Sequence, residues 1–176
     1  KNLRSKTITK KNKAFRTEYL NYDEYGNAGV ILNRGNLADA SDDKELHMEY
    51  WHEKNTQAAE FGLTDRVVHS WVQTSGTPAI IRNEVYFTYD EYGQMLTKEE
   101  VVARNSHNVW QYGYDEYGNL VREEAPNGLV TRYEYAAKGA WLTRTTQETE
   151  SGVLETKKFY YLNTGRLSRE TDVNGH

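Results

Sequence analysis

Short segments of the chain alternate aromatic or β-branched residues with polar ones. The pattern aromatic-x-Tyr recurs, for example at Phe87-Thr88-Tyr89 and Tyr112-Gly113-Tyr114. Successive side chains of a strand point to opposite faces, so both rings of a motif share one face. Tyr, Phe, Val and Thr also favour a pleated surface. The alternation predicts strands at residues 14–22, 28–34, 45–52, 65–73, 79–89, 95–103, 109–114, 119–124, 129–135, 141–148, 153–161 and 166–171.

Turn signals separate these segments. In the clearest cases Asp follows the last Tyr, and Gly comes three residues later. The Asp carboxylate can accept backbone N–H bonds in a tight turn, and Gly supplies the positive φ that closes it. A second class of turn carries Asn-Gly or Ser-Gly, at Ser75-Gly76, Pro126-Asn127-Gly128, Ser151-Gly152 and Asn174-Gly175; residues 104–107 are expected to form a turn without Gly.

The spacing of these turns indicates the fold class. Over the last third of the chain the turn glycines lie 10 to 13 residues apart. This is one strand and one turn each time, which is typical of an all-β array of antiparallel hairpins. Residues 35–44 and 53–64 are the two loosest segments, and residues 53–60 look like an insertion. One helical turn is expected there, around residues 57–61.

The chain is also internally repetitive. Tyr-Asp-Glu-Tyr-Gly-Asn occurs at residues 22–27 and 114–119, and a near copy ending in Gln occurs at residues 89–94. Weaker copies follow at Tyr135 and Tyr161. Repetition of this kind favours an array whose function belongs to the assembled surface. The residues assigned to the structural repeat are Tyr22, Asp23, Gly26, Tyr89, Asp90, Gly93, Tyr114, Asp115, Gly118, Tyr135, Gly139, Tyr161 and Gly165.

Composition favours a thin sheet. The hydrophobic residues make up 37% of the chain and include 14 Tyr, so little purely apolar material is left for a thick core. A tyrosine can bury its ring while its hydroxyl stays solvated. We therefore treat residues 1–176 as one repeat segment, with a first unit at 15–35, degenerate units at 36–85 and regular units at 86–176. The chain starts with Lys, and we expect it to be a piece of a longer array.

Charge and chemistry exclude several classes of function. The net charge is −4, with basic and acidic residues well mixed, so no basic stripe for nucleic acid is present. No apolar run is long enough to predict a membrane span, and there is no Cys for disulfides or thiolate metal sites. No Ser/His/Asp elbow, phosphate-binding Gly loop or Cys nucleophile is found. We expect no catalytic activity, no cofactor and no metal.

Four groups of residues have an alternative functional interpretation. The repeated carboxylates Asp23, Asp90 and Asp115 could be catalytic, but their recurrence at the same position of three repeats favours a capping role. His47, Glu49, His52 and Glu53 could bind metal, but on one strand they would not converge. Asp39, Asp42 and Asp43 are expected to form a solvated acidic loop. Trp110 and Trp141 could contact a glycan, although packing between hairpins is favoured.

The repeats resemble RHS repeats, also called YD repeats after Tyr22-Asp23, Tyr89-Asp90 and Tyr114-Asp115. The order of motifs, with Arg34-Gly35-Asn36-Leu37, Tyr50 and residues 61–68, resembles the repeat region of bacterial insecticidal toxin complexes and polymorphic RHS toxins, and more distantly that of teneurins. The resemblance covers the chain from about residue 16 onward. Two copies depart from it, because Ala136 and Leu162 follow Tyr135 and Tyr161 where Asp is expected.

The resemblance implies a function as well as a fold. Such repeats form an extended, curved strip of hairpins that is part of a larger shell, and the shell sequesters a toxic or unfolded C-terminal polypeptide. Expected partners are other RHS repeats of the same protein, the enclosed toxin and other toxin-complex subunits, in a secreted or cell-surface bacterial virulence protein. The aspartyl autoprotease segment usual in toxin shells is not recognisable in this chain. The alternative is a cell-surface adhesion or carbohydrate-binding module.

Overall fold

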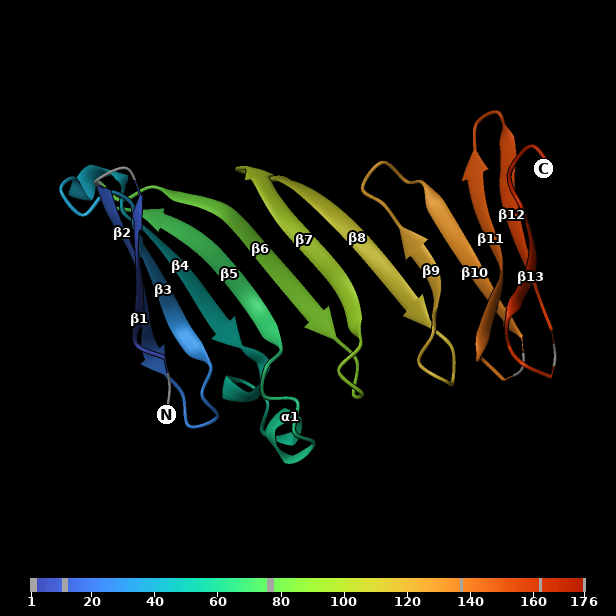
Figure 1. The fold of residues 1–176 in the computed structure, drawn as a ribbon, viewed down its shortest axis with the longest axis horizontal. Helices are drawn as coiled ribbons and strands as arrows, with labels where there is room; N and C mark the ends of the chain where they lie inside the picture. The colour runs from blue at the N-terminus through green and yellow to red at the C-terminus, as the bar shows by residue number, and fades with distance from the viewer. Residues whose placement is uncertain (1–2, 11–12, 76–77, 137, 162, 176) are drawn as a thin grey trace. The chain divides into compact units, whose positions relative to one another are not determined.

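The computed structural model describes residues 3–10, 13–75, 78–136, 138–161 and 163–175 (Figure 1). Its strands are hydrogen-bonded in the order in which they follow along the chain, and the register of each described pair is antiparallel. The fold is therefore an all-β array of hairpins, as the alternation predicted. The strands are β1 (Ser5–Lys10), β2 (Lys13–Tyr22), β3 (Ala28–Arg34), β4 (Lys44–Tyr50), β5 (Val67–Thr74), β6 (Ile81–Tyr89), β7 (Met95–Ala103), β8 (Ser106–Tyr114), β9 (Leu120–Glu124), β10 (Val130–Ala136), β11 (Trp141–Thr149), β12 (Gly152–Tyr160) and β13 (Leu167–Thr171).

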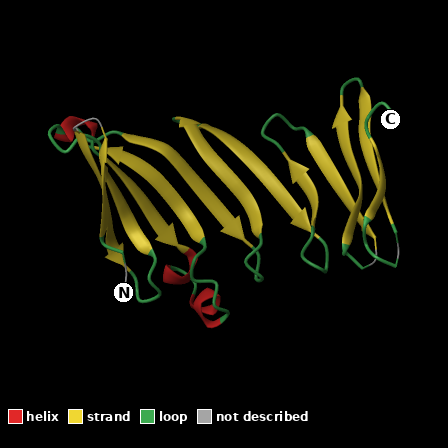
Figure 2. Cartoon of the chain, viewed as in Figure 1, coloured by secondary structure: helices red, strands yellow, loops and turns green. Residues whose placement is uncertain are grey.

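Helical structure among the described residues is confined to two connections (Figure 2). A 3₁₀ turn, η1 (Ala40–Asp42), lies between β3 and β4. A second, η2 (Trp51–Glu53), and the short helix α1 (Thr56–Glu60) lie between β4 and β5. The helical turn expected around residues 57–61 is confirmed. The strand expected at 45–52 was too long, because the chain leaves β4 after Tyr50 and enters η2.

Strand β1 was missed by the sequence analysis. It pairs with β2 in the register Ile8↔Phe15, and every one of its residues is exposed. The segment Ser-Lys-Thr-Ile-Thr-Lys has no aromatic-x-Tyr motif. Its strand conformation depends on the neighbouring strand, since an exposed, lysine-rich segment has little apolar surface of its own to bury.

The turns follow the predicted chemistry where they are described. Gly128 and Gly175 have positive φ and donate back to Ala125 and Asp172. The connection from β7 to β8 has no Gly, and there Asn105 takes the positive φ of 63°. Gly152 is the first residue of β12, paired with Thr149. The Gly76 of the expected Ser75-Gly76 turn lies outside the described residues.

The chain separates into two compact units, each of which is described by itself. The first comprises Lys1–Gly93 and Glu99–His107, and the second comprises Gln94–Lys98 and Asn108–His176. Within each unit the strands run side by side in chain order (Figure 1). Both η turns and α1 belong to the first unit.

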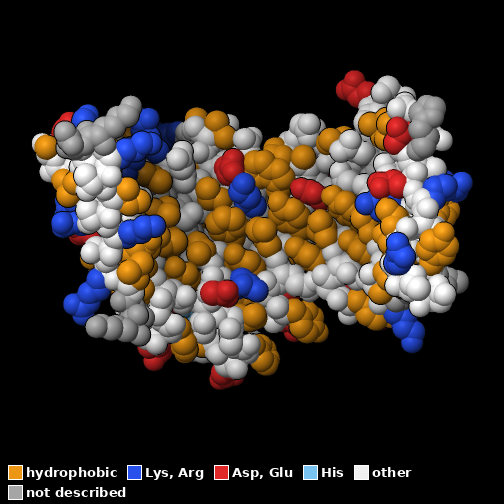
Figure 3. Space-filling model, in the orientation of Figure 1, with side chains coloured by type: hydrophobic (Ala, Val, Ile, Leu, Met, Phe, Trp, Pro, Cys, Tyr) orange, Lys and Arg blue, Asp and Glu red, His pale blue; other side chains and the backbone are white. Residues whose placement is uncertain are grey.

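Little of the described structure is fully buried. The buried hydrophobic residues are Ala28, Val30, Leu32, Tyr50 and Ala58, all in the first unit, and no large side chain is completely enclosed among the described residues. Hydrophobic side chains are instead seen at the surface, interspersed with charged ones (Figure 3). Each hairpin thus depends on backbone pairing and on contacts with its neighbours rather than on a thick core.

Candidate functional site

A tyrosine hydroxyl closes the open end of six hairpins. Each of these tyrosines lies at or next to the end of an even-numbered strand, and it donates to a backbone carbonyl at or near the start of the preceding strand. We call them the latch tyrosines. The pairs are Tyr22 to Leu3, Tyr50 to Ala28 (3.0 Å), Tyr89 to Val67 (2.7 Å), Tyr114 to Met95 (2.9 Å), Tyr135 to Leu120 (3.0 Å) and Tyr160 to Leu142 (2.9 Å).

These bonds change the role expected for the repeat tyrosines. The sequence predicted buried rings with solvated hydroxyls, whereas the hydroxyls satisfy carbonyl groups at strand ends. Burial raises the pKa of Tyr50, Tyr89 and Tyr135, which favours the neutral hydroxyl. These three hydroxyls are therefore hydrogen-bond donors at neutral pH.

The aspartates of the repeat organise the connections between hairpins. Asp23 Oδ1 accepts the backbone N–H of Tyr25 (3.0 Å) and of Asn27 (2.8 Å). In the second identical copy, Asp115 Oδ1 accepts the equivalent N–H groups of Tyr117 and Asn119, both at 2.9 Å. Asp90 accepts that of Tyr92 at 2.9 Å. These carboxylates are engaged by their own turns rather than converging on one substrate.

Hydrogen bonding also sets the charge state of these aspartates. Partial burial by itself raises the pKa of Asp23, but the bonds from Asn27 and Tyr25 and the nearby His52 outweigh it, so the pKa lies below its ordinary value. The same balance of desolvation against bonds from Asn119 and Tyr117 lowers the pKa of Asp115. Gly26 and Gly118 close the two turns with φ of 92° and 84°, a conformation that residues with a Cβ rarely adopt.

The two weaker copies close differently. Gly139 and Gly165 have the positive φ of turn residues. The latch in the last copy is Tyr160 and not Tyr161, so the sequence alignment was displaced by one residue. Tyr161 is 59% exposed and occupies the position of the missing Asp, where its N–H donates to Arg166 and its carbonyl accepts from Gly165. Without an Asp to organise it, this turn is one residue longer.

Residues 51–66, which connect β4 to β5, bridge two of the repeat turns. We call this segment the clamp. Asn55 caps the start of α1 by accepting from Gln57 and Ala58, and Ala58 is buried beneath it. On one side, the Nδ2 group of Asn27 donates to Thr64 (2.9 Å). On the other side, Arg66 donates to the carbonyl of Gly93 (3.0 Å). The clamp thus ties the turn after β2 to the turn after β6.

His52 makes the most buried polar contact of the clamp. Its side chain is 7% exposed, and its Nε2 lies 3.2 Å from Asp23 Oδ2. The ring also meets the edge of Tyr25 at 5.0 Å between centroids, while Nδ1 is buried with no hydrogen-bond partner among the described residues. From the sequence, His52 was a candidate metal ligand only. No short-range pattern links position 52 to position 23.

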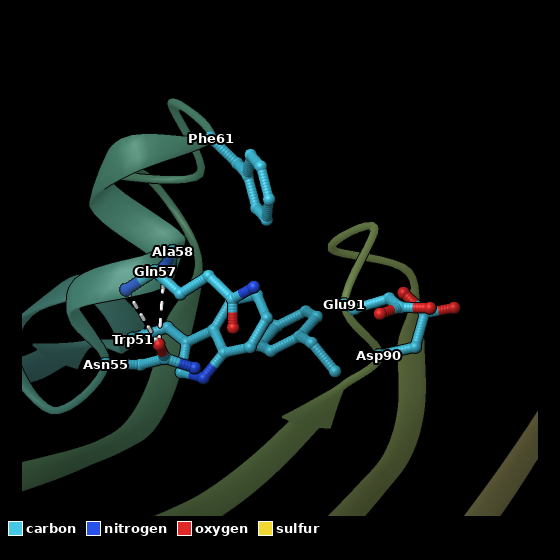
Figure 4. Close-up of a pocket in the computed structure, with 8 residues that line it drawn as sticks. Trp51, Asn55, Gln57, Ala58, Phe61, Asp90 and Glu91 are labelled. Atoms are coloured by element: carbon cyan, nitrogen blue, oxygen red, sulfur yellow. Dashed lines mark hydrogen bonds between the residues drawn. The ribbon is translucent and has the colours of Figure 1, made fainter.

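A small pocket lies between the clamp and the turn after β6 (Figure 4). Its volume is about 190 Å³. The rings of Trp51 and Tyr89 form one wall, 5.6 Å apart and tilted by 31°. Phe61, at the end of α1, is 61% exposed. The lining residues are Trp51, Asn55, Gln57, Ala58, Phe61, Tyr89, Asp90 and Glu91. No pattern in the sequence indicated this pocket.

The residues considered for metal binding serve other contacts. His47 stacks on Trp71 at 4.8 Å, and its Nε2 lies 2.9 Å from Glu45. Glu49 pairs with Lys54, and Glu53 accepts the N–H of Tyr50. In the described part of the chain no group of three or more His, Asp or Glu side chains is arranged to hold a metal ion.

The acidic loop is more structured than expected. Asp39 caps η1 by accepting from Ser41, and Asp42 accepts the N–H of Asn36. Asp43 is 7% exposed and pairs with Arg34 at 3.0 Å. It is therefore buried and paired, where a solvated carboxylate had been expected.

The two tryptophans considered for glycan contact both pack within the second unit. The Lys98 ammonium lies over the Trp110 ring, 4.6 Å from its centroid. Trp141 stacks on the latch Tyr160 at 5.7 Å, and a Cβ on Gly165 would lie 3.2 Å from its ring. Lys98 and Trp110 belong to the hairpin β7–β8, and Trp141 and Tyr160 to the hairpin β11–β12, so these ring contacts lie within hairpins, where packing between hairpins was expected.

Comparison with known proteins supports the fold. No protein-family model and no curated protein matches the sequence. Among solved structures, the pore state of the Photorhabdus luminescens Tc holotoxin with the TccC3 D651A mutation matches 88% of this chain, with a TM-score of 0.61 and 11% identity. A TcdB2–TccC3–TEV complex matches 87%, with a TM-score of 0.52 and 13% identity. The fold is one that Tc toxin chains contain.

This likeness agrees with the resemblance drawn from the repeats, since toxin complexes were the proteins that the order of motifs resembled. This chain spans only 8% and 9% of the matched Tc chains. The likeness therefore concerns one segment of much longer polypeptides. Among the described residues, no helix has the length and apolar character needed to cross a membrane.

Proposed function

We propose that this chain is a wall segment of an RHS-type shell that encloses and sequesters a toxic or unfolded C-terminal polypeptide. The role is steric and involves no chemical reaction. The observation that carries the proposal is the series of latch tyrosines, because each one closes the open end of a hairpin. A wall needs such closure, since an unpaired strand end exposes backbone groups to whatever the shell contains.

The likeness to Tc toxin chains supports this function at the level of the fold. Neighbouring repeats of the same protein would then extend the sheet on either side of the segment, and other toxin-complex subunits would be the further partners. We place this shell in a secreted or cell-surface protein. The alternative of glycan contact through Trp110 and Trp141 is less favoured, because both rings are occupied by packing.

Protease protection tests the proposal. The longer protein that carries this chain is treated with protease, and digestion of the polypeptide that follows the repeats is compared with digestion of the same polypeptide produced alone. We expect strong protection within the whole protein. Replacing two latches, Tyr114→Ala and Tyr135→Ala, is expected to reduce that protection. Equal digestion of the polypeptide in both contexts would contradict enclosure.

A further inference from the structure

The pocket beside α1 is lined in part by side chains that do not hold the clamp in place. The clamp is held by His52, Thr64 and Arg66, through their contacts with Asp23, Asn27 and Gly93. The side chains of Gln57 and Phe61 make no such contact. They face the pocket together with Trp51, and in Figure 4 the Gln57 amide lies between the Phe61 ring and Trp51.

The sheet itself does not require this segment. After β6 and after β8 the chain reaches the next strand with only residues 90–94 and 115–119, whereas residues 51–66 connect β4 to β5. Long connections within compact β structure are more often functional than short ones. At the end of the added helix, Phe61 is 61% exposed and lines the pocket.

The side chains that line the pocket indicate which class of ligand it would bind. Trp51, Tyr89 and Phe61 offer aromatic surface, and Gln57 offers an amide that both donates and accepts hydrogen bonds. The Oδ1 atom of Asn55 caps α1, and its Nδ2 group takes no part in that cap. Asp90 and Glu91 also line the pocket, and Oδ1 of Asp90 accepts the N–H of Tyr92. A neutral ligand with apolar faces and hydroxyl edges fits these walls.

We propose that this pocket binds one sugar ring of a carbohydrate. The C–H face of the ring would pack on Phe61, and its hydroxyl groups would bond the amides of Gln57 and Asn55. The pocket volume of about 190 Å³ is below the range usual for drug-sized ligands, which restricts the site to one sugar unit of a longer glycan. The site shares only Tyr89 with the latches, and the residues changed in its test, Gln57 and Phe61, belong to the clamp and are not latches.

A glycan array with the whole chain, followed by calorimetric titration of the best-bound sugar, tests the proposal. Saturable binding is expected. Phe61→Ala and Gln57→Ala should each weaken it by about tenfold or more, a difference of about 1.4 kcal/mol. Tyr92→Ala is the matched control, since Tyr92 is a 73% exposed aromatic residue on the neighbouring turn outside the pocket. It should leave the affinity unchanged.

Three results would overturn the site. One is the absence of saturable binding to any sugar on the array. The second is a native affinity in both Phe61→Ala and Gln57→Ala, with circular dichroism showing that the variants are folded. The third is loss of binding in Trp110→Ala while Phe61→Ala binds as the native chain does. That result would show that the glycan binds the second unit. None of these results bears on protease protection. The sugar site can therefore be contradicted without contradicting the wall function, and the reverse also holds.

Discussion

Two identical hexapeptides occupy different surroundings in this chain. Residues 22–27 lie in the first unit and residues 114–119 in the second. Both form the same turn, with one Asp accepting two backbone N–H groups and one Gly at positive φ. The first copy is contacted by the clamp, through His52 on Asp23 and through the carbonyl of Thr64, which accepts from Asn27.

The second copy is fixed by its neighbouring turn instead. A Cβ placed on Gly139 would collide with the side chains of Asn119 and Tyr117, so the next turn approaches this one as closely as a glycine permits. The comparison separates two effects. The six residues determine the conformation of the turn, while elements distant in sequence determine how firmly it is anchored.

The largest expected effect concerns the buried latch of the first unit. Tyr50 is 7% exposed, whereas Tyr135 of the second unit is only partly buried. Tyr50→Ala should destabilise the chain by about 3–5 kcal/mol, as for other buried aromatic residues. Tyr135→Ala should cost less. Chemical denaturation of both variants measures the difference, and equal losses would show that burial does not distinguish the two units.

Removal of the turn aspartates directly tests the two hexapeptides. Asp23→Ala should cost about 1–3 kcal/mol, because it leaves two N–H groups and the buried His52 without their acceptor. Asp115→Ala should lower the free energy of unfolding by less, since no histidine among the described residues pairs with Asp115. Hydrogen exchange at the amides of Asn27 and Asn119 reports each turn separately. His52→Gln is a control variant, and it should lower the stability of the first turn to near that of the second. Unchanged hydrogen exchange at Asn27 in this variant would argue against anchoring by the clamp.

Acid should lower the stability of both turns. The folded-state pKa of Asp23 and of Asp115 is lowered, so each carboxylate stabilises the fold above its ordinary pKa, and that stability is lost as pH falls through the lowered value. NMR shifts of the Tyr25 and Tyr117 amides, followed below about pH 4, should report this loss. Asp23→Asn should remove the titration at Tyr25 only. If the Tyr25 amide shift still titrates in Asp23→Asn, the titrating group is not Asp23.

The smallest effect is expected from the latch hydroxyls alone. Tyr89→Phe and Tyr114→Phe keep the ring and remove one hydrogen bond each, with an expected cost of about 0.5–1.5 kcal/mol. The carbonyls of Val67 and Met95 would lose their donors. Thermal unfolding measures the cost. Stability equal to that of the native chain in both variants would mean that water replaces the hydroxyl without loss.

Much of the fold could be predicted because its signals are local. The alternation around Tyr89 and Tyr114 predicted β6 and β8, and the predicted limits of β3 and β7 agree with the structure to the residue. Strand β1 could not be predicted in this way, since a polar, exposed segment becomes a strand only when β2 offers it hydrogen bonds. The one-residue displacement at Tyr161 has a similar cause: without Asp, nothing in the sequence marks where the turn begins.

The candidate site was less predictable than the fold. His52 reaches Asp23 across 29 positions of sequence, and Trp51 meets Tyr89 across 38. Neither contact follows a helical or strand period. The sequence indicated an insertion near residues 53–60 but not what it touches, because the segment connects elements that only the paired strands bring close.

By itself, the sequence determined the class of the fold, the repeating unit and the chemistry of its turns, since strand alternation, Asp capping and glycine at positive φ act within a few residues. The tertiary structure decided which atoms the repeat residues use. In the folded chain the tyrosine hydroxyls donate to carbonyls 15 to 22 residues away, and the clamp contacts two turns. Such contacts depend on the register of adjacent strands, which is set only when the strands pair.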